Sequence, residues 1–237
     1  MVWKTTIHDF LKKAPYFWRL APRFADKEDA KFVSTHQYWE DRYAAGGTSG
    51  SGSAGVLAQF KAKIINDFVQ DRRIQTLIEF GCGDGNQLAL SHYENYLGLD
   101  ISISAIRQCI GKFSADKTKK FCLYDPECFL DNGDDFVANA SLSLDVIYHL
   151  IEDDVFKSYM EHLFRSAEFY VIIYSSNFER AVSARHVMHR KFTPYIAEHF
   201  PDWKLLKQIK NPHPAKSDED KFGSFSEFYI YERQRPK

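Results

Sequence analysis

The sequence lacks features that mark several classes of protein. None of its four cysteines (Cys82, Cys109, Cys122 and Cys128) belongs to a CxxC pair, so we expect reduced thiols and no zinc knuckle or disulfide scaffold. No run reaches the roughly 18 to 20 apolar residues that span a bilayer, and residues 1–15 lack the uninterrupted apolar stretch of a signal peptide. We therefore expect a soluble, cytoplasmic protein without a transmembrane segment.

An excess of charge is also missing, because 31 Lys and Arg residues stand against 32 Asp and Glu residues. Binding to bulk nucleic acid needs surplus basic charge to neutralise phosphates, so the composition argues against such a partner. The 237 residues, 44% of them hydrophobic, fit one large globular domain, with or without an extra segment. Aromatic residues reach 16%, more than a core of this size needs, so some rings are expected to line a pocket or an interface.

Residues 1–35 combine aromatic and basic side chains, and we expect one or two short helices broken at Pro15 and Pro22. Two interpretations stay open. The segment is an arm packed on the main domain, or it is a lid or surface patch for an amphiphilic acceptor at the inner face of a membrane. The main domain is expected to span residues 36–237.

A glycine- and serine-rich stretch, 46–55, separates two segments with helical patterns, 36–45 and 56–70. This composition is typical of flexible linkers. Between two helices, however, it also suits a tight loop whose backbone N–H groups lie beside a polar ligand. We expect the loop, provided that the site inferred below exists.

From residue 75 onward, apolar strand-like runs alternate with amphipathic helical segments, which is typical of βαβ units and a parallel sheet. The expected strands are 75–80, 95–100, 119–125, 143–148 and 168–176, and the expected helices are 102–113 and 152–167. Two final strands, 203–210 and 226–233, have no helix between them and are expected to pair antiparallel at the sheet edge. The segment 178–200 is expected to be helical, interrupted near Thr193-Pro194. The sequence thus predicts a Rossmann-like α/β fold: a seven-stranded, mostly parallel sheet with an antiparallel final hairpin, helices on both faces and an N-terminal helical arm.

One motif carries the functional argument. The buried strand ending at Phe80 runs into three alternating glycines, Gly81, Gly83 and Gly85, followed by a helix start. Glycines allow a sharp turn and close approach of a ligand to the main chain, and the helix start offers free N–H groups. The spacing departs from the dinucleotide fingerprint, which would need a glycine where Asn86 stands.

An acidic residue stands where a ribose could be held. Asp100 ends the second predicted strand, 19 residues after Gly81, and a carboxylate there can accept two hydrogen bonds from a ribose diol. The alternative is a turn or capping role before Ser102. Together the glycines and Asp100 indicate a nucleoside-containing cofactor.

The chain resembles the class I S-adenosylmethionine-dependent methyltransferases over residues 36–233. EFGCGDG is similar to that family's first motif, LGLD to its second-strand acid and LDVIYHLIED to its fourth-strand motif. The last two strands resemble its final hairpin. The segment YWEDRYAAGGTSGSGSAG resembles a subset of these enzymes associated with surface-polysaccharide biosynthesis.

The resemblance implies S-adenosyl-L-methionine as cofactor and assigns roles around it. Glu79 would lie near the methionyl amino group, Asp100 would hold the ribose hydroxyls, and Asp125 would lie near the adenine amine. From the subset, Arg42 would pair with the cofactor carboxylate. The implied cofactor-binding set is Tyr38, Trp39, Arg42, Glu79, Phe80, Gly81, Gly83, Gly85, Asp100, Ile101, Asp125, Leu144 and Asp145.

Methyl transfer needs a base only when the acceptor atom carries a proton that must leave, as a sugar hydroxyl does. His149, just after the fourth predicted strand, is the candidate catalytic base, because open α/β sheets bind ligands at strand carboxyl ends. The alternative is a ring that packs over the cofactor or caps the next helix. Glu152 and Asp153 nearby suit the first turn of that helix.

Four basic residues are expected to bind the acceptor. His186, His189 and Arg190 would share one helix face and, with the neighbouring Arg185, grip an anionic sugar, or form a solvated basic face. Asn177, at the end of the fifth strand, is a further acceptor-binding candidate. No third ligand accompanies the histidines, so we expect no metal.

The favoured function is O-methylation of a sugar or glycan in surface-polysaccharide biosynthesis. N- or carboxyl-methylation of a small metabolite stays open, as does a cofactor-binding partner of a glycosyltransferase without catalysis. A nicotinamide-dependent oxidoreductase is disfavoured by the glycine spacing and the final strands. The sequence does not decide the oligomeric state.

Overall fold

A computed structural model describes residues 32–129, 133–182, 184–220 and 222–234. Residues 1–31 of the expected arm lie outside the described part of the chain. None of the helices in the described ranges is long and apolar enough to cross a membrane.

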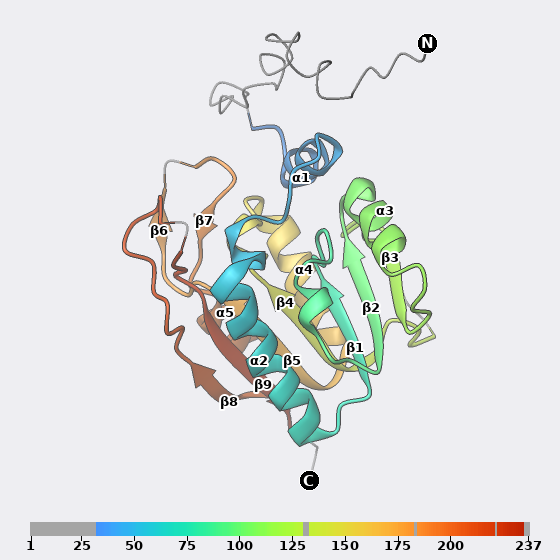
Figure 1. Cartoon of the computed structure of the whole chain (residues 1–237). Coiled ribbons are helices and arrows are strands. Elements are labelled where there is room, and N and C mark those ends of the chain that lie inside the picture. The colour runs from blue at the N-terminus through green and yellow to red at the C-terminus, as the bar shows by residue number, and fades with distance from the viewer. Residues whose placement is uncertain (1–31, 130–132, 183, 221, 235–237) are drawn as a thin grey trace, which may run out of the picture. The chain divides into compact units, whose positions relative to one another are not determined.

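Seven described strands form one sheet in the order β3-β2-β1-β4-β5-β9-β8 (Figure 1). The bounds are β1 Thr76–Phe80, β2 Asn95–Asp100, β3 Lys119–Leu123, β4 Ala138–Leu144, β5 Ala167–Ser175, β8 Trp203–Ile209 and β9 Glu227–Arg233. The neighbouring strands β3, β2, β1, β4 and β5 pair parallel, and β9 pairs antiparallel with both β5 and β8. The predicted fold class is confirmed, including the final hairpin on the sheet edge.

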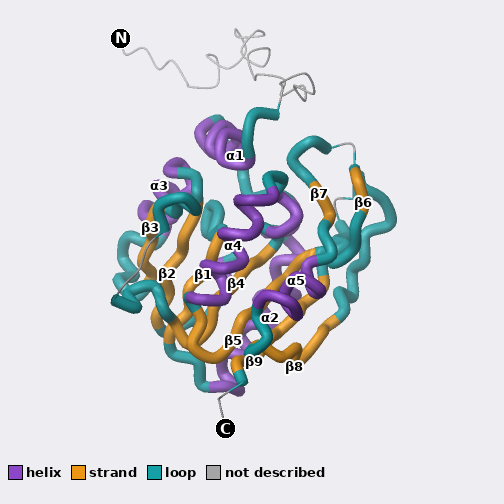
Figure 2. The backbone as a smooth tube through the Cα atoms, turned by 180° about the vertical axis from the view of Figure 1, so that it is seen from behind, coloured by secondary structure: helices purple, strands orange, loops and turns teal. Residues whose placement is uncertain are grey.

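Helices cover both faces of this sheet (Figures 1 and 2). The α-helices are α1 Thr35–Ala44, α2 Gly55–Arg72, α3 Ile103–Lys112, α4 Asp153–Arg165 and α5 Phe192–His199, and the short 3-10 turns are η3 Ser51–Ser53, η4 Leu88–Leu90 and η5 Ile147–His149. Side-chain caps fix two of the helix starts. Ser34 accepts the N–H of Gln37 before α1, and Ser102 accepts the N–H of Ala105 before α3 as the sequence predicts, both at 3.1 Å.

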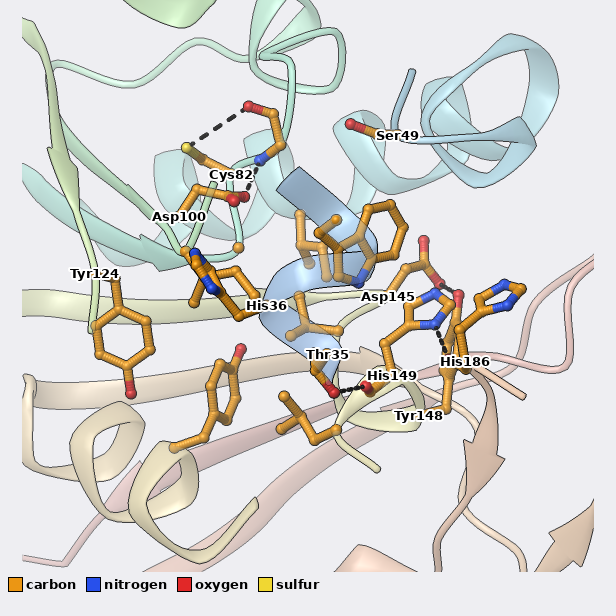
Figure 3. A pocket seen from close by; sticks show the side chains of 18 of the residues that line it. Thr35, His36, Ser49, Cys82, Asp100, Tyr124, Asp145, Tyr148, His149 and His186 are labelled. Atoms are coloured by element: carbon orange, nitrogen blue, oxygen red, sulfur yellow. Dashed lines mark hydrogen bonds between the residues drawn. The ribbon is translucent and has the colours of Figure 1, made fainter. Parts of the chain in front are cut away.

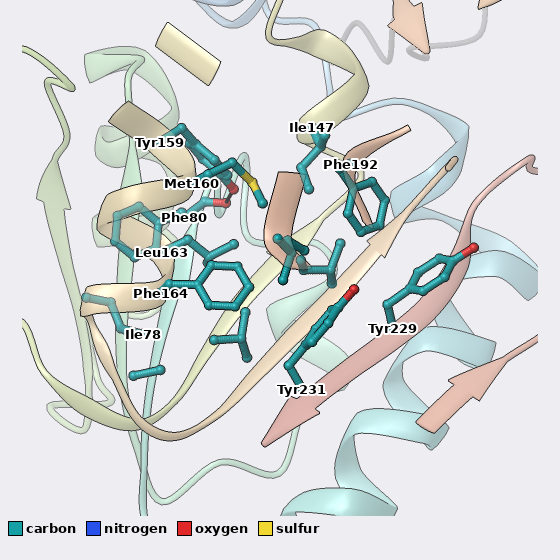
Figure 4. Packing of buried hydrophobic residues seen from close by; sticks show 14 of the residues in the cluster. Ile78, Phe80, Ile147, Tyr159, Met160, Leu163, Phe164, Phe192, Tyr229 and Tyr231 are labelled. Carbon is teal, nitrogen blue, oxygen red and sulfur yellow. Dashed lines mark hydrogen bonds between the residues drawn. The ribbon is translucent and has the colours of Figure 1, made fainter. Parts of the chain in front are cut away.

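The sheet separates two hydrophobic clusters because successive side chains of a strand point to opposite faces. In β1, Leu77 packs with Ile65 of α2, whereas Ile78 packs with Phe164 of α4 and Phe192 of α5. Figure 4 shows this second cluster, in which α4 and α5 side chains lie on strand residues. Full burial of each such side chain stabilises the fold by about 1.5–3 kcal/mol. The packed core therefore fixes the positions of the strand ends.

Three sequence predictions of local structure are wrong. The glycine turn is followed by the 3-10 turn η4 rather than by the start of an α-helix. Strand β4 ends at Leu144 rather than at residue 148, because Asp145 adopts a left-handed conformation (φ +60°) and the chain turns into η5. The predicted helix over 178–200 is instead a small hairpin, β6 Arg180–Ala181 with β7 Met188–His189, followed by the short α5. Pro194 lies in the first turn of α5, where a missing N–H is tolerated and no interruption results.

Candidate functional site

A cavity of about 940 Å³ opens at the carboxyl ends of the central strands. Its walls come from the turn after β1, the ends of β2 and β4, helix α1, the loop 46–55 and η5. Such volumes lie at the upper end of the range for small-molecule sites, about 300–1,000 Å³. Figure 3 shows Asp100 and Cys82 on one side, and Asp145, Tyr148 and His149 on the other.

The glycine turn is packed so closely that side chains are excluded. Gly81 and Gly83 have φ of +85° and +58°. A Cβ on Gly81 would lie 2.4 Å from Cγ2 of Val146, and one on Gly83 would lie 2.3 Å from Oγ of Ser49. These two glycines therefore let the main chain itself form the cavity wall.

Asp100 is bound to this turn by the backbone. Its Oδ2 accepts the N–H of Gly83 at 2.8 Å and its Oδ1 accepts the N–H of Ser102 at 2.9 Å. Burial raises the pKa of Asp100 to about 6, although both hydrogen bonds act to lower it. The carboxylate lines the cavity in a fixed orientation, with acceptor capacity left for a ligand hydroxyl.

Two further buried acceptors line the same wall. Glu79 accepts the hydroxyl of Tyr96 at 2.6 Å, and burial raises its pKa to about 7 despite that hydrogen bond and the nearby charge of Lys61, which both lower it. Gln87 donates through Nε2 to the carbonyl of Ala58, but its buried Oε1 has no partner among the described residues. An unpaired buried acceptor is costly, so this corner suits a ligand that brings N–H donors.

The loop 46–55 is a wall of the cavity. The N–H of Ser49 donates to Asp84 Oδ2 and the N–H of Asp84 donates back to Ser49 Oγ, both at 3.1 Å. The hydroxyl of Tyr43 lies 2.9 Å from the same Ser49 Oγ. Residues 49–53 all line the cavity, so this stretch is a docked loop rather than a free linker.

Helix α1 closes the cavity and is anchored at both ends. Glu40 accepts the hydroxyls of Ser102 and Ser104, each at 2.6 Å. At the other end, Thr35 donates to the carboxylate of Glu152 through its N–H at 3.0 Å and its hydroxyl at 2.6 Å. The helix therefore bridges the Asp100 region and the segment that follows β4.

His149 lines the cavity opposite Asp100. Its Nδ1 lies 2.8 Å from the carbonyl oxygen of His186. A carbonyl only accepts, so Nδ1 carries the proton and Nε2 keeps a lone pair. Burial is the main cause that lowers the pKa of His149, to about 4. The ring is thus neutral at ordinary pH and available as a proton acceptor.

No protein-family model matches the sequence, and no curated protein matches it. Solved structures do match. NodS, an N-methyltransferase from Bradyrhizobium japonicum WM9 in complex with S-adenosyl-L-homocysteine, has a TM-score of 0.67 and 13% identity over 86% of this chain and 100% of that one. The magnesium protoporphyrin IX methyltransferase ChlM from Synechocystis PCC 6803 with bound SAM has a TM-score of 0.60 and 13% identity over 86% and 100%. The methyltransferase domain of bacterial CtHen1-C has a TM-score of 0.57 and 19% identity over 74% and 97%.

The chain has the class I methyltransferase fold. The similar structures include a magnesium protoporphyrin IX methyltransferase and the small RNA methyltransferase HEN1, so the fold is shared by enzymes with unlike substrates. Within this methyltransferase fold the cavity stands at the ends of β1, β2 and β4.

The structure brings most of the predicted cofactor residues to this cavity. Those on its wall are Trp39, Arg42, Glu79, Gly81, Gly83, Asp100, Ile101, Asp125, Leu144 and Asp145. Three lie elsewhere. Phe80 is fully buried among core rings, Gly85 packs against Phe113 and Cys109, and Tyr38 stacks on the ring of His186.

The predicted acceptor-binding face does not exist, because residues 185–190 form a turn and a strand instead of a helix. Arg190 is bound to the carbonyls of Leu150 and Ile151 and to Asp153, and Arg185 is exposed away from the cavity wall. His186 lines the cavity. Nδ1 of His189 lies 2.7 Å from Oγ of Ser176, and the side chain of Asn177 is hydrogen-bonded to that of Thr193 at the start of α5. In the described ranges, no cluster of three or more His, Cys, Asp or Glu side chains is arranged to hold a metal.

Lys61 is a cavity residue that the sequence argument missed. It lies on the buried face of α2, 1% exposed, and its Nζ is 2.7 Å from Oδ2 of Asp145. Asp145 also accepts the hydroxyls of Tyr148 and Ser226. The signal was available, since Lys61 stands four residues after the apolar Leu57 and four before Ile65, a spacing that places it on the buried stripe.

Proposed function

We propose that this protein is an S-adenosylmethionine-dependent methyltransferase that methylates a hydroxyl of a sugar or another polar small molecule. The observation that carries the proposal is the joint placement of Asp100, the side-chain-free glycine turn and the neutral His149 around one cavity. The fold supports the reaction class, and the resemblance to enzymes of polysaccharide biosynthesis supports the sugar acceptor.

The residues present fit the cofactor. Gln87 Oε1, buried without a donor, and Glu79 would receive the ammonium of the amino-acid part. Asp100 would accept the ribose hydroxyls, while Arg42 and Lys61 would face the carboxylate. When bound, S-adenosylmethionine supplies a methyl group activated by a positively charged sulfur. We call Glu79, Gly81, Gly83, Gln87 and Asp100 the cofactor wall.

The opposite side of the cavity would position the acceptor. We call Trp39, Tyr148, His149, His186 and Val187, all of which line the cavity, the acceptor wall. Aromatic and aliphatic side chains here suit the apolar faces of a sugar ring and exclude water from the reacting atoms. Alignment and exclusion of water are the main tasks, because the methyl group is already activated.

His149 would accept the hydroxyl proton at Nε2. An acceptor hydroxyl becomes strongly acidic as its oxygen gains the methyl group, so a base with a pKa of about 4 still takes the proton. The low pKa has a second consequence: the base remains in its active, neutral form over the whole physiological pH range. The carbonyl of His186 would stabilise the ring by holding the Nδ1 proton.

We further propose a domain division for the chain and a cellular location for the reaction. Residues 1–35 would be an arm or lid beside the methyltransferase domain of residues 36–237. The enzyme would act in the cytoplasm, on a glycan carried at the inner face of the membrane. The mix of aromatic and basic residues in 1–35 supports that contact.

Transfer of radiolabelled methyl from S-adenosylmethionine to a panel of sugars tests the function directly. The panel pairs each free sugar with its amino-sugar and uronic-acid counterparts. Label on hydroxyl-only sugars supports O-methylation. Label confined to amino sugars or to uronic acids would replace it by N- or carboxyl-methylation.

A further inference from the structure

We propose that Tyr38 and His186 are positioning residues for His149. In this proposal a stack of rings that starts on α1 holds His186 in place, and the main-chain carbonyl of His186 fixes the tautomer and the orientation of His149. The inference rests on the proposed function, because it gives His149 the role of base.

Three nearly parallel rings form the stack, and they come from three separate segments. The ring of Tyr38, on α1, lies 4.2 Å from that of His186 with an interplanar angle of 11°. The ring of His186, in the turn between β6 and β7, lies 5.6 Å from that of His149, on η5, with an angle of 13°. Within the stack, Tyr38 acts on His149 through His186; Tyr38 also meets the neighbouring Trp39 ring edge-on at 5.4 Å.

His186 controls two degrees of freedom of His149. Its ring faces the His149 ring, and its own carbonyl oxygen accepts the Nδ1 proton at 2.8 Å, as Figure 3 shows. A displacement of His186 would thus remove the planar neighbour and the hydrogen bond together. Loss of that hydrogen bond would let the proton occupy Nε2, and the atom that should accept the substrate proton would be blocked.

The other contacts of His149 do not choose its tautomer. The ring of Tyr148 lies 4.5 Å from that of His149 at an angle of 54°, and this contact does not distinguish the two ring nitrogens. Trp39 meets His149 edge-on at 4.9 Å and 80°, so it limits ring rotation without choosing the tautomer. The hydroxyl of Thr35 lies 3.0 Å from the main-chain carbonyl of His149, which locates the backbone only. Among these contacts, only the carbonyl of His186 distinguishes the two ring nitrogens.

The same helix reaches the cofactor wall. Glu40 binds Ser102, whose N–H is bonded to Asp100, and Arg42 donates to the carbonyl of Thr48 in the loop 46–55. Docking of α1 would therefore complete the cofactor wall and set the base in one event. As a consequence, His149 would be correctly oriented as a base only when α1 is docked.

Matched variants separate the ring stack from other roles. Tyr38→Leu removes the ring, whereas Tyr38→Phe keeps it and loses only a hydroxyl whose contact to Arg42 is long, at 3.4 Å. His186→Ala removes the second ring, and His186→Phe keeps an aromatic ring. All four variants retain the main-chain carbonyl of residue 186, so a changed tautomer reports that this carbonyl has moved away from Nδ1 of His149 once a ring of the stack is lost.

The tautomer of His149 is read by ¹⁵N-edited NMR of the protein saturated with S-adenosylhomocysteine, with the signal assigned by its loss in His149→Gln. The wild type and both Phe variants are expected to show the Nδ1–H tautomer. Tyr38→Leu and His186→Ala are expected to show an Nε2–H population. Their kcat for the best sugar of the panel should fall roughly 10- to 100-fold, while their Kd for S-adenosylhomocysteine stays within about twofold.

Three results would overturn the inference. The first is an unchanged His149 tautomer and kcat in Tyr38→Leu. The second is an equal loss of kcat in Tyr38→Phe and Tyr38→Leu, which would assign the effect to the hydroxyl. The third is a loss of cofactor affinity as large as the loss of rate, which would place Tyr38 in the cofactor wall. Failure of the wild type to transfer methyl would refute the proposed function instead, and the tautomer measurement would still decide the positioning role.

Discussion

The cofactor wall is built from short consecutive motifs at the ends of neighbouring strands, whereas the acceptor wall joins segments far apart in the chain. The N–H of Gly81 donates to the carbonyl of Leu99 in the neighbouring strand, and the N–H of Gly83 donates to the side chain of Asp100. His149 and His186 meet across 37 residues through a turn that side-chain contacts hold in place. The first wall is determined by local sequence and sheet pairing, and the second by tertiary packing.

The largest predicted effect is on the cofactor wall. Gly81→Ala places a Cβ 2.4 Å from Val146 at a φ of +85°, so strain and overpacking together should weaken binding of S-adenosylhomocysteine roughly 100-fold or more. Gly111→Ala is the matched control, because its Cβ would meet nothing within 4 Å. Calorimetry measures the affinities and thermal melting checks the fold. Adding Val146→Ala should recover part of the loss; no recovery would show that the close approach is not the cause.

The next effect tests the acceptor wall. His149→Gln should lower kcat about 100-fold through loss of the base, with little change in cofactor affinity. His189→Gln, whose ring is bonded to Ser176 away from the cavity, should leave kcat near the wild-type value. Equal rates for His149→Gln and the wild type would remove His149 as base and leave it a packing role.

Asp100 gives a smaller effect on cofactor binding. Part of it comes through the glycine turn, because the amide nitrogen of Asn cannot accept the N–H of Gly83 or Ser102. Asp100→Asn removes charge-assisted hydrogen bonds to the ribose and should weaken binding about 10- to 100-fold. Asp125→Asn is the comparison, since Asp125 is exposed and its Oδ1 accepts the N–H of Glu127 in a turn. Similar losses in the two variants would contradict the special place of Asp100.

The pH dependence of binding sharpens the comparison further. Burial raises the pKa of Glu79 to about 7 and that of Asp100 to about 6, so both are partly protonated in mildly acidic solution. A ligand that brings donors favours the ionised forms, so affinity for S-adenosylhomocysteine should rise from pH 5.5 to 7.5 by up to about tenfold per unit. Glu79→Gln should flatten the upper part of this curve in calorimetric titrations. If affinity depends on pH equally steeply in that variant, ionisation of Glu79 is not the cause of the pH dependence.

The smallest effect concerns the basic residues after β5. Arg185 is exposed and lies off the cavity wall, so Arg185→Ala should change the acceptor KM by less than about twofold. A KM that rises tenfold for uronic acids alone would restore an anion-binding role for this segment.

The sequence predicted well which residues gather around the turn after β1 and the end of β2, because the signals are local. In a parallel sheet, the ends of neighbouring strands lie side by side. Alternating glycines after one apolar run and an acid at the end of the next strand are therefore brought together. Lys61 and Gln87 were missed although the helical spacing around Lys61 contained a usable signal. Orphan acceptors such as Gln87 Oε1 become visible only when neighbouring segments pack.

The segment after β5 was predicted poorly, because residues 178–190 have the composition of a basic helix whereas the described strands β6 and β7 pair antiparallel. Arg190 is held there by the carbonyls of Leu150 and Ile151 and by Asp153, and His189 by Ser176. Those partners are 13 to 40 residues away, so local propensity is overridden by contacts that a single sequence does not display. The left-handed Asp145, which ends β4 early, is a second example.

The most direct test of the central claim is a calorimetric titration of the full chain with S-adenosylhomocysteine, with NAD as the control. The cofactor wall predicts micromolar binding of S-adenosylhomocysteine, binding weakened about 10- to 100-fold in Asp100→Asn, and no binding of NAD. Binding of NAD without S-adenosylhomocysteine, or binding of neither, would contradict the assignment and leave the glycine turn a purely structural element.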